Sequence, residues 1–462
     1  MERRRLAAPV LVACPDARPP AYQSVVGLNR ARLLGSFVTS TYYDRAGYLA
    51  TLLRRLAPIR YARLERILLR RHEPEIPRAL VRTVPSFDVA LRIEGRMAAR
   101  HPQITRALAR WRTDRFDKRL AQIVGRSRPE AVLLFSDVGS AATLPLCRRL
   151  GIPSIVSMVH GDVRDEDRVL ETEAAIAPEY MGMYLGGGSL DSTLLAWIHE
   201  RRLRDLALAD RILVPSDHIA QRLVGQGTPK EKLHVIPYAA DCRRFEPASD
   251  KRDLDTCTFL FAGGISQRKG IKYLLEAWQR IRRPGWRLQL LGPMPVKLGP
   301  LAPYLEIVEP LGRVSHAEMP ARLRQADVFV FPSLFEGSAV VTYEALASGL
   351  PSVVTAEAGS VVRDGLEGFV VGARDVVALA ARMETLGRDR DLRARMAGAA
   401  RARALAFDWP RYHRAIVAVV NDLIGQQNDR GPGRPRERLD RGLLDASEVS
   451  GAHPRCSTEV QR

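Results

Sequence analysis

Short apolar runs alternate with amphipathic stretches along the first half of the chain. Between the predicted strands, residues 22–34, 136–150 and 193–209 have the period of helices with one apolar face. Ser216 is a predicted N-cap for a further helix. Residues 162–191 are acidic and contain a Gly-Gly-Gly-Ser run, which favours a loop or lid. The buried strands predicted here are residues 8–13, 37–41, 131–135, 153–159, 211–214 and 234–237.

A second alternating series follows the polar residues 246–255, which are the predicted linker. A helix is expected over 270–281, where Leu274 and Trp278 share one face, and Ser315 and Glu318 form a capping box for another. The strands predicted in this series are residues 258–262, 287–291, 305–308, 327–331, 351–355 and 368–371. Because strands that alternate with helices form mostly parallel sheets covered on both faces, two series predict two Rossmann-like domains.

The predicted organisation has four parts. Residues 1–245 form the first domain and residues 250–407 form the second. Residues 408–426 form a C-terminal helix, with the option of crossing back to the first domain. Residues 427–462 are rich in Arg, Gly, Pro and Asp with little apolar content, which predicts a disordered tail.

Composition excludes several classes of protein. With 46% hydrophobic and 27% charged residues, the chain has the balance of a globular protein and is not disordered throughout. No apolar run approaches the ~18–20 residues of a membrane-spanning helix, and the basic N-terminus lacks the features of a signal peptide. The five cysteines form no C-x-x-C pair, so we expect reduced thiols in the cytoplasm and no structural zinc.

The net charge of +19 is concentrated near the N-terminus, where residues 1–150 hold 29 Lys and Arg against 12 Asp and Glu. Such a region favours an anionic partner, namely a membrane surface, an acidic polymer or a nucleic acid. Only seven of the 71 basic residues are Lys, so a general preference for Arg is the alternative explanation. The region has no recognisable nucleic-acid-binding motif, and a nucleic-acid partner is not expected.

Residues 49–72 are the most amphipathic basic segment, although Pro58 interrupts it. At a lipid interface the leucines would insert while the arginines met anionic headgroups. The alternative is an ordinary surface helix that packs its leucines on the first domain. The basic residues are Arg54, Arg55, Arg60, Arg63, Arg66, Arg70 and Arg71, and the apolar ones are Leu49, Leu52, Leu53, Leu56, Leu64, Ile67 and Leu68.

The strongest chemical signal is the run FPSLFEGSAVVTYEAL at residues 331–346. A buried strand ends at residue 332, a loop carries Glu336, and a helix is expected from near Ser338. The N-terminus of such a helix suits an anion, and Gly337 permits close approach of the backbone. Two carboxylates, Glu336 and Glu344, would flank the anion and accept hydrogen bonds from sugar hydroxyl groups. The alternative is a pair of solvated glutamates.

A second strand, loop and helix unit reads FAGGISQRKG at residues 261–270. Gly263 and Gly264 allow a tight loop, and Arg268 and Lys269 stand where a diphosphate needs positive charge. The alternative is a pair of exposed basic residues at a helix start.

Together these two motifs resemble the C-terminal half of the family 4 glycosyltransferases, which have the GT-B fold. Glu336 and Glu344 match the E-x7-E motif, and the R-K-G loop, residues 311–315 and the run ADVFVFPS at residues 326–333 match as well. In the first half, LADRILVPSDHIAQRL at 208–223 and VIPYAAD at 235–241 are similar to the family's approach to the second domain. His160 matches the family's histidine at the cleft edge. The resemblance is good over residues 130–410 and loose over residues 1–130.

The resemblance implies an α/β GT-B fold, with an acceptor-side domain over residues 1–245 facing a donor-nucleotide-binding domain over residues 250–407 across a cleft. It implies an enzyme that transfers a hexosyl unit, with retention, from a nucleotide diphosphate sugar to a glycan or lipid-linked acceptor. We expect a role in cell-envelope polysaccharide synthesis, in the cytoplasm or peripherally on the inner face of the membrane. No metal or other cofactor is expected, because two cations face the diphosphate.

The resemblance also assigns site residues. Glu344 would hold the ribose hydroxyls, Glu336 would face the donor sugar, and His160 would contact the sugar or the acceptor hydroxyl unless it is a purely structural histidine. The residues expected in catalysis are His160, Glu336, Arg268 and Lys269. Those expected to bind the donor nucleotide are Gly263, Gly264, Arg268, Lys269, Gly337, Ser338, Ala339, Val340 and Glu344.

Three departures keep other functions open. Gly264 stands where the family often has Arg, Tyr238 and Ala239 replace an Asn-Gly pair, and the glycine pair usual after the first strand is missing. The alternatives are a GT-B relative such as a sugar-nucleotide epimerase, a donor-binding but inactive glycosyltransferase, and a non-catalytic module that binds anions or nucleotides.

Overall fold

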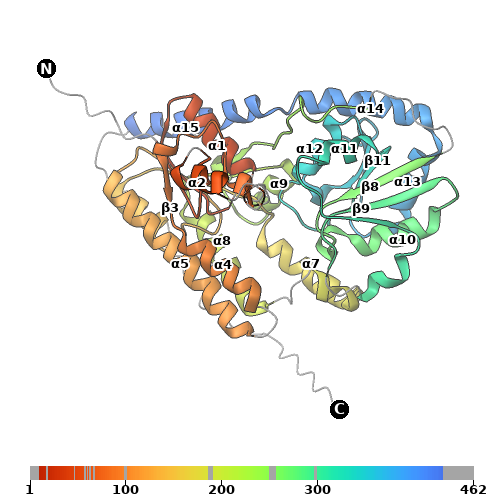
Figure 1. Ribbon diagram of the computed structural model, residues 1–462, viewed down its shortest axis with the longest axis horizontal. Coiled ribbons are helices and arrows are strands. Elements are labelled where there is room, and N and C mark those ends of the chain that lie inside the picture. The colour runs from red at the N-terminus through yellow and green to blue at the C-terminus, as the bar shows by residue number, and fades with distance from the viewer. Residues whose placement is uncertain are drawn as a thin grey trace, which may run out of the picture.

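The computed structural model describes residues 10–429, apart from residues 17–18, 46, 57–58, 60, 62–63, 66–67, 98–100, 186–190, 249–255 and 296–298. Over these residues, two parallel sheets with their helices build two lobes that stand side by side (Figure 1). The predicted α/β fold with two Rossmann-like domains is confirmed.

The first lobe contains, among the described residues, a seven-stranded sheet of order β3-β2-β1-β4-β5-β6-β7. All its pairs are parallel, and the strand order reverses between β1 and β4. The strands are β1 (Val10–Ala13), β2 (Leu34–Thr39), β3 (Val81–Thr83), β4 (Val132–Phe135), β5 (Ser154–Ser157), β6 (Arg211–Val214) and β7 (Leu233–Val235).

The helices of the first lobe cover both faces of this sheet, and α4 and α5 lie along each other at its outer side (Figure 1). The α-helices are α1 (Pro19–Arg30), α2 (Tyr48–Leu56), α4 (Ser86–Met97), α5 (Pro102–Ser127), α6 (Thr143–Leu150), α7 (Val163–Ile176), α8 (Ser192–Leu208) and α9 (Asp217–Gly225). The 3₁₀ helices are η1 (Leu69–Arg71), η2 (Arg78–Leu80), η3 (Pro178–Met183) and η4 (Lys230–Lys232).

The second lobe has a parallel sheet of order β10-β9-β8-β11-β12-β13. Its strands are β8 (Cys257–Ala262), β9 (Trp286–Leu291), β10 (Glu309–Gly312), β11 (Val328–Phe331), β12 (Ser352–Thr355) and β13 (Gly368–Val371). Its helices are η5 (Gln267–Lys269), α10 (Ile271–Ile281), η6 (Gly299–Tyr304), α11 (Met319–Arg324), α12 (Val340–Ala347), η7 (Ala356–Ala358), α13 (Val376–Arg388) and α14 (Arg390–Leu405). The central strand β11 reads VFVF and is buried at every position, as a strand covered on both faces requires.

The last helix, α15 (Trp409–Asp429), leaves the second lobe and packs along α1 of the first (Figure 1). The Tyr412 hydroxyl lies 3.0 Å from Ser24 Oγ, and His413 Nε2 lies 2.8 Å from Gln23 Oε1. Gly27 permits this close contact, because a Cβ on it would lie 2.9 Å from the Cβ of His413. The helix thus ties the two lobes together at the edge opposite α7.

Several sequence predictions differ from the structure. Residues 163–176 form α7 instead of a loop or lid; the Asp162 side chain caps this helix by accepting a hydrogen bond from the Arg164 N–H. The strand predicted at 305–308 is wrong, because the Ile307 carbonyl accepts a hydrogen bond from Trp278 Nε1 and the strand β10 begins only at Glu309. The tail predicted from residue 427 begins inside α15, and residues 430–462 lie outside the described residues.

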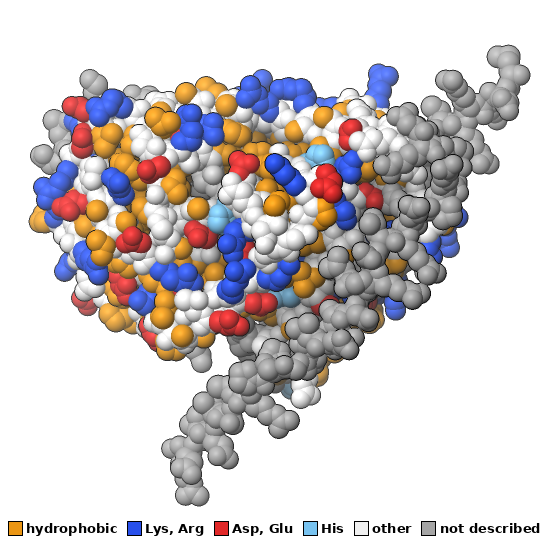
Figure 2. Space-filling view, turned by 180° about the vertical axis from the view of Figure 1, so that it is seen from behind, with side chains coloured by type: hydrophobic (Ala, Val, Ile, Leu, Met, Phe, Trp, Pro, Cys, Tyr) orange, Lys and Arg blue, Asp and Glu red, His pale blue; other side chains and the backbone are white. Residues whose placement is uncertain are grey.

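Side chains of both charges share the surface. Cys14, Cys147 and Cys257 are buried, and Cys242 is half-buried. On the face shown in Figure 2, Lys and Arg side chains are interspersed with Asp and Glu. Among the described helices, none is long and apolar enough to span a bilayer.

Candidate functional site

The loop between β8 and α10 lies directly on the end of β11. Gly270 has a φ of 72°, and a Cβ at this position would lie 1.9 Å from the Pro332 carbonyl oxygen. Only glycine allows this contact at this φ without strain. The close approach brings the basic pair before Gly270 next to the loop that carries Glu336.

Arg268, Lys269 and Glu336 form one charged cluster. Lys269 Nζ lies 2.5 Å and Arg268 Nη2 lies 3.4 Å from Glu336 Oε1. Lys269 Nζ also stands 4.7 Å from the centre of the Phe331 ring, and Arg268 Nη1 donates to the Phe335 carbonyl at 3.2 Å. Two cations share one carboxylate, so the cluster keeps a net positive charge at the carboxyl edge of the second sheet, where anionic ligands bind in such folds.

The loop after Glu336 touches the first lobe. A Cβ on Gly337 would lie 2.6 Å from the Val159 carbonyl oxygen and 2.8 Å from the His160 nitrogen. The Ser216 hydroxyl donates to the Gly337 carbonyl at 3.1 Å. The structure therefore brings the loop of Glu336 and the loop of His160 together from opposite lobes.

The residues between Gly337 and α12 are largely engaged within the second lobe. The Ser338 hydroxyl donates to the Gly359 carbonyl at 2.7 Å, and the Ala339 N–H donates to the Ala358 carbonyl at 3.1 Å. The helix α12 begins at Val340, two residues after the predicted start. The N–H groups of Val340 and Val341 have no acceptor within their own helix and suit an anion, whereas the Thr342 N–H donates to the Ala339 carbonyl at 3.0 Å.

Glu344 is buried in α12 and paired with His316, which follows β10. His316 Nε2 lies 2.9 Å from Glu344 Oε1, and Arg244 Nη1 lies 2.8 Å from His316 Nδ1. Because an arginine only donates, Nδ1 is the acceptor and Nε2 carries the proton that bonds Glu344. Any hydroxyl that binds this carboxylate oxygen therefore competes with His316.

His160 stands at the carboxyl end of β5 with its side chain buried. Nδ1 lies 2.8 Å from the Gly161 carbonyl oxygen, which makes Nδ1 the donor and leaves Nε2 as an acceptor. Burial, reinforced by the nearby Arg202 charge, lowers the pKa of His160 to about 4, so the ring is neutral at pH 7. In the part of the chain that the structure describes, Nε2 has no hydrogen-bond partner.

Asp137, at the end of β4, is the nearest acidic group to this ring, with Oδ1 4.0 Å from His160 Nε2. Its backbone φ is 79°, in the left-handed region that is costly for an aspartate. Contacts with α8 keep it there. Arg202 Nε donates to Asp137 Oδ1 at 2.9 Å, and Asp205 accepts the Asp137 N–H at 2.8 Å.

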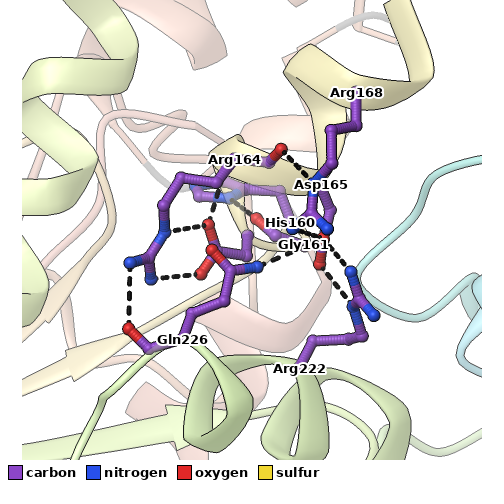
Figure 3. Close-up of polar contacts among 8 residues, drawn as sticks. His160, Gly161, Arg164, Asp165, Arg168, Arg222 and Gln226 are labelled. Atoms are coloured by element: carbon purple, nitrogen blue, oxygen red, sulfur yellow. Dashed lines mark hydrogen bonds and ion pairs between the residues drawn. The ribbon is translucent and has the colours of Figure 1, made fainter. Parts of the chain in front are cut away.

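The N-terminal end of α7 is fastened to α9 of its own lobe, as Figure 3 shows. Asp165 accepts hydrogen bonds from Arg222 Nε at 2.9 Å, Arg168 at 2.6 Å and Gln226 at 3.1 Å. Burial alone would raise the pKa of Asp165, but the hydrogen bonds and charge of Arg222 bring that pKa below its ordinary value. The carboxylate is therefore ionised and holds the helix next to His160.

The C-terminal end of α7 reaches into the second lobe through Glu173, which is fully buried. Its carboxylate accepts hydrogen bonds from Arg374 Nε at 2.7 Å, Gln267 Nε2 at 2.5 Å and the Tyr273 hydroxyl at 2.9 Å. Gln267 directly precedes Arg268 in the loop described above. The segment predicted as a loop or lid thus braces the basic loop from the other lobe.

A cavity of about 250 Å³ lies between the lobes beside this brace. It is lined by residues of α7 and α9, by the loop at residues 334–336, and by Glu357 and Arg374. The site is therefore a cleft with contributions from both sheets.

Sequence reasoning did not find Asp137, Glu173 or His316 as site residues. Glu173 was one of many acidic residues in its segment, and His316 lay inside a predicted capping box. The only available signal was that Asp137 follows a buried strand, since polar residues at the carboxyl ends of parallel strands tend to line sites. The remaining partnerships join residues far apart in the chain.

Two family models match this chain and together cover about two thirds of it. Residues 66–239 match the glycosyl transferase 4-like domain, and residues 256–389 match glycosyl transferases group 1. The chain is 31% identical over 194 residues to the putative colanic acid biosynthesis glycosyltransferase WcaL of Salmonella typhimurium, covering 39% of this chain and 48% of WcaL. It is 32% identical over 240 residues to a D-inositol 3-phosphate glycosyltransferase of Geodermatophilus obscurus, covering 46% of this chain and 53% of that protein. The chain thus spans about half the length of these curated relatives.

Solved structures share the whole fold at low sequence identity. Sucrose-phosphate synthase from Thermosynechococcus elongatus aligns with a TM-score of 0.60 and 17% identity, over 90% of this chain and 99% of that one. HepE of Anabaena, in complex with UDP and glucose, aligns with a TM-score of 0.54 and 16% identity, over 90% of this chain and 100% of that one. With its two GT-B lobes and both halves matched by glycosyltransferase models, the chain belongs to the family 4 glycosyltransferases.

Proposed function

We propose that this protein is a retaining glycosyltransferase that moves a hexosyl unit from a nucleotide diphosphate sugar to a glycan or lipid-linked acceptor. The observation that carries the proposal is the meeting of Lys269, Arg268 and Glu336 with the His160 loop in one cleft. The UDP and glucose in HepE support a nucleotide-sugar donor, and the name of WcaL supports a cell-envelope polysaccharide as the product.

The main chemical task is to stabilise the departing diphosphate. As the bond between the anomeric carbon and the diphosphate oxygen breaks, negative charge grows on the leaving group. Lys269, Arg268 and the amides at the start of α12 meet that charge without rearrangement, and one such contact is typically worth ~3–4 kcal/mol. The positive charge is supplied by the chain itself, so we propose that turnover continues in the presence of EDTA.

The two carboxylates and the histidine divide the remaining tasks. Glu344 accepts hydrogen bonds from the ribose after His316 yields its place, and Glu336 contacts the donor sugar. The neutral His160 receives a hydrogen bond from a sugar or acceptor hydroxyl at Nε2. The acceptor oxygen then bonds to the anomeric carbon, and its proton leaves with the diphosphate.

A panel of UDP-, GDP- and ADP-sugars tests this proposal. The true donor, at ~100 times its dissociation constant, should stabilise the protein against unfolding by about 2.7 kcal/mol. That donor should also release its nucleoside diphosphate faster when an acceptor is present. Conversion of the donor to its epimer without an acceptor would favour the epimerase, and binding without turnover would favour the inactive module.

We further propose that residues 49–72 bind an anionic membrane on its cytoplasmic side. Among the residues of this segment that the structure describes, Leu56 and Ile59 are 72% and 75% exposed, which supports an apolar edge open to solvent, although Tyr61 is buried against Tyr43. Pro58, Arg60, Arg63, Arg66 and Ile67 lie outside the described residues. Sedimentation with anionic and neutral vesicles at two salt concentrations is the test. Binding should require anionic lipid and weaken with salt; equal binding to both vesicles would contradict the electrostatic attachment.

A further inference from the structure

A second cavity, of about 250 Å³, lies inside the first lobe. It opens at the carboxyl ends of β1, β4 and β5, and α4, α5 and α8 supply its walls. The order of strands reverses between β1 and β4 at this point. Open parallel sheets bind their ligands in the crevice that such a reversal creates. The cavity therefore lies where such sheets bind ligands, apart from the charged cluster of the second lobe.

The walls of this cavity are mainly apolar. Phe87 and Leu91 come from α4, Ala109 comes from α5, and Leu194 and Trp197 come from α8. These five residues belong to segments that are distant in sequence and meet only in the folded lobe. Their side chains offer an apolar ligand the kind of lining that small-molecule pockets use.

Three charged residues of the lining, Glu94, Arg112 and Arg201, are paired on the helical walls, and Asp16 and Asp137 add carboxylates at the strand ends. Arg112 Nε donates to Glu94 Oε1 at 2.6 Å, and Arg112 also lies over the Phe87 ring at 4.5 Å. Arg201 pairs with Asp117 at 3.3 Å. A ligand in this cavity therefore meets apolar walls and neutralised ion pairs, which is a poor environment for a fully hydroxylated sugar chain.

One end of the cavity is polar and faces the cleft. Asp137 and Val159 line this end, and Asp137 Oδ1 is 4.0 Å from His160 Nε2. Ser136, also in the lining, is 8% exposed, and its hydroxyl has no hydrogen-bond partner among the described residues. A hydroxyl group placed here would satisfy that serine and stand next to the neutral imidazole.

We infer that this cavity binds the apolar part of an amphiphilic acceptor, with the hydroxyl that receives the sugar at the end formed by Ser136, Asp137 and His160. The inference rests on the proposed function and selects a lipid-type acceptor over a purely glycan one. Exposed apolar side chains beside the cavity support a lipid-type acceptor. Leu91 lines the cavity and is 40% exposed, and Val89 on the same helix is 57% exposed. Both residues lie on α4, which forms one wall of the cavity and reaches the surface there.

The test measures binding of methyl, hexyl and octyl β-D-glucopyranoside to the full chain by calorimetry, each below its micelle concentration. Each methylene group that enters the cavity should tighten binding by about fourfold. We expect the octyl compound to bind at least about tenfold more tightly than the methyl compound. The Ala109→Phe variant, which fills the cavity, should remove this preference.

Two further variants guard the result against a folding defect. Leu194→Ser makes the wall polar and should weaken octyl glucoside binding about tenfold, whereas Ile104→Ser changes an exposed residue of α5 outside the cavity and should leave binding unchanged. Equal binding of all three glucosides, or a preference that survives both cavity variants, would overturn the inference.

UDP-sugar protection against unfolding, measured on the same proteins, separates this inference from the proposed function. If a donor protects the protein against unfolding but the glucosides show no chain-length preference, only the acceptor inference is overturned. A chain-length preference without protection by any donor in the panel supports the cavity and contradicts the glycosyltransferase proposal.

Discussion

The two lobes have the same kind of sheet but very different sites. In the second lobe, Arg268, Lys269 and Glu336 form a charged cluster from two strand-loop-helix units on the paired strands β8 and β11. In the first lobe, an apolar cavity collects side chains from α4, α5 and α8. The comparison indicates that a charged site can be built from short local motifs, whereas an apolar cavity is assembled by tertiary packing.

The largest effect is expected for the charged cluster of the second lobe. Lys269→Ala should lower turnover about 100- to 1,000-fold, because it removes a fixed cation from the departing diphosphate. Stability should change little, since the side chain lies at the cleft. Lys272→Ala is the matched control, because Lys272 lies three residues further on, in the first turn of α10, and pairs with Glu276 of the same helix. Steady-state rates that fall equally in both variants would contradict a specific role for Lys269.

Glu173 tests whether the lobes depend on each other. Glu173→Ala should lower the free energy of unfolding by about 3 kcal/mol, because it leaves the half-buried Arg374 and the buried Gln267 and Tyr273 without their acceptor. Glu171→Ala, an exposed position on the same helix, should be nearly neutral. Denaturant titration measures the free energy of unfolding of both variants. Equal values for Glu173→Ala and Glu171→Ala would show that the contacts of Glu173 contribute nothing to stability.

The buried His160 predicts a pH dependence specific to the first lobe. Its pKa is about 4 in the folded protein and about 6.5 in the unfolded chain, so the unfolded state binds more protons between these values. The free energy of unfolding therefore keeps its full value above about pH 6.5. As the pH falls toward 4, protonation of His160 in the unfolded chain lowers it by up to about 3 kcal/mol.

His160→Gln should flatten this part of the curve of stability against pH. The contribution of His413, whose pKa burial also lowers to about 4, should remain in that variant. Superimposable curves for the wild type and His160→Gln would show that His160 titrates normally.

A smaller effect distinguishes the two glutamates of the donor side. Glu344→Gln should weaken binding of free UDP by about tenfold, the loss expected when an uncharged group replaces a charged acceptor of hydrogen bonds. Glu336→Gln should leave UDP affinity within about twofold and instead slow transfer. Calorimetry measures the UDP affinity of each variant, and steady-state kinetics with the full donor measures its transfer rate. Equal UDP affinities for the two variants would show that the assigned roles are wrong.

How much of the molecule could be predicted from sequence also differs between the lobes. Buried strands such as β6 and β13 were predicted at their observed bounds, because short apolar runs between turns carry a clear signal. Lys269 and Glu336 were recognisable because each stands in the segment that follows a strand within a local motif. Glu173 was not, since its partners Gln267 and Arg374 lie in the other lobe. The apolar cavity was equally invisible, because Leu91 and Trp197 look like ordinary core residues until the lobe is folded.

Hydrogen–deuterium exchange of the full chain with separate ligands tests the central claim most directly, namely that one lobe holds the nucleotide and the other the acceptor. UDP should slow exchange in residues 263–270 and 337–344 of the second lobe, and octyl β-D-glucopyranoside should slow it in residues 86–97 and 105–116 of the first. Protection of the first lobe by UDP, or of the same segments by both ligands, would contradict the account.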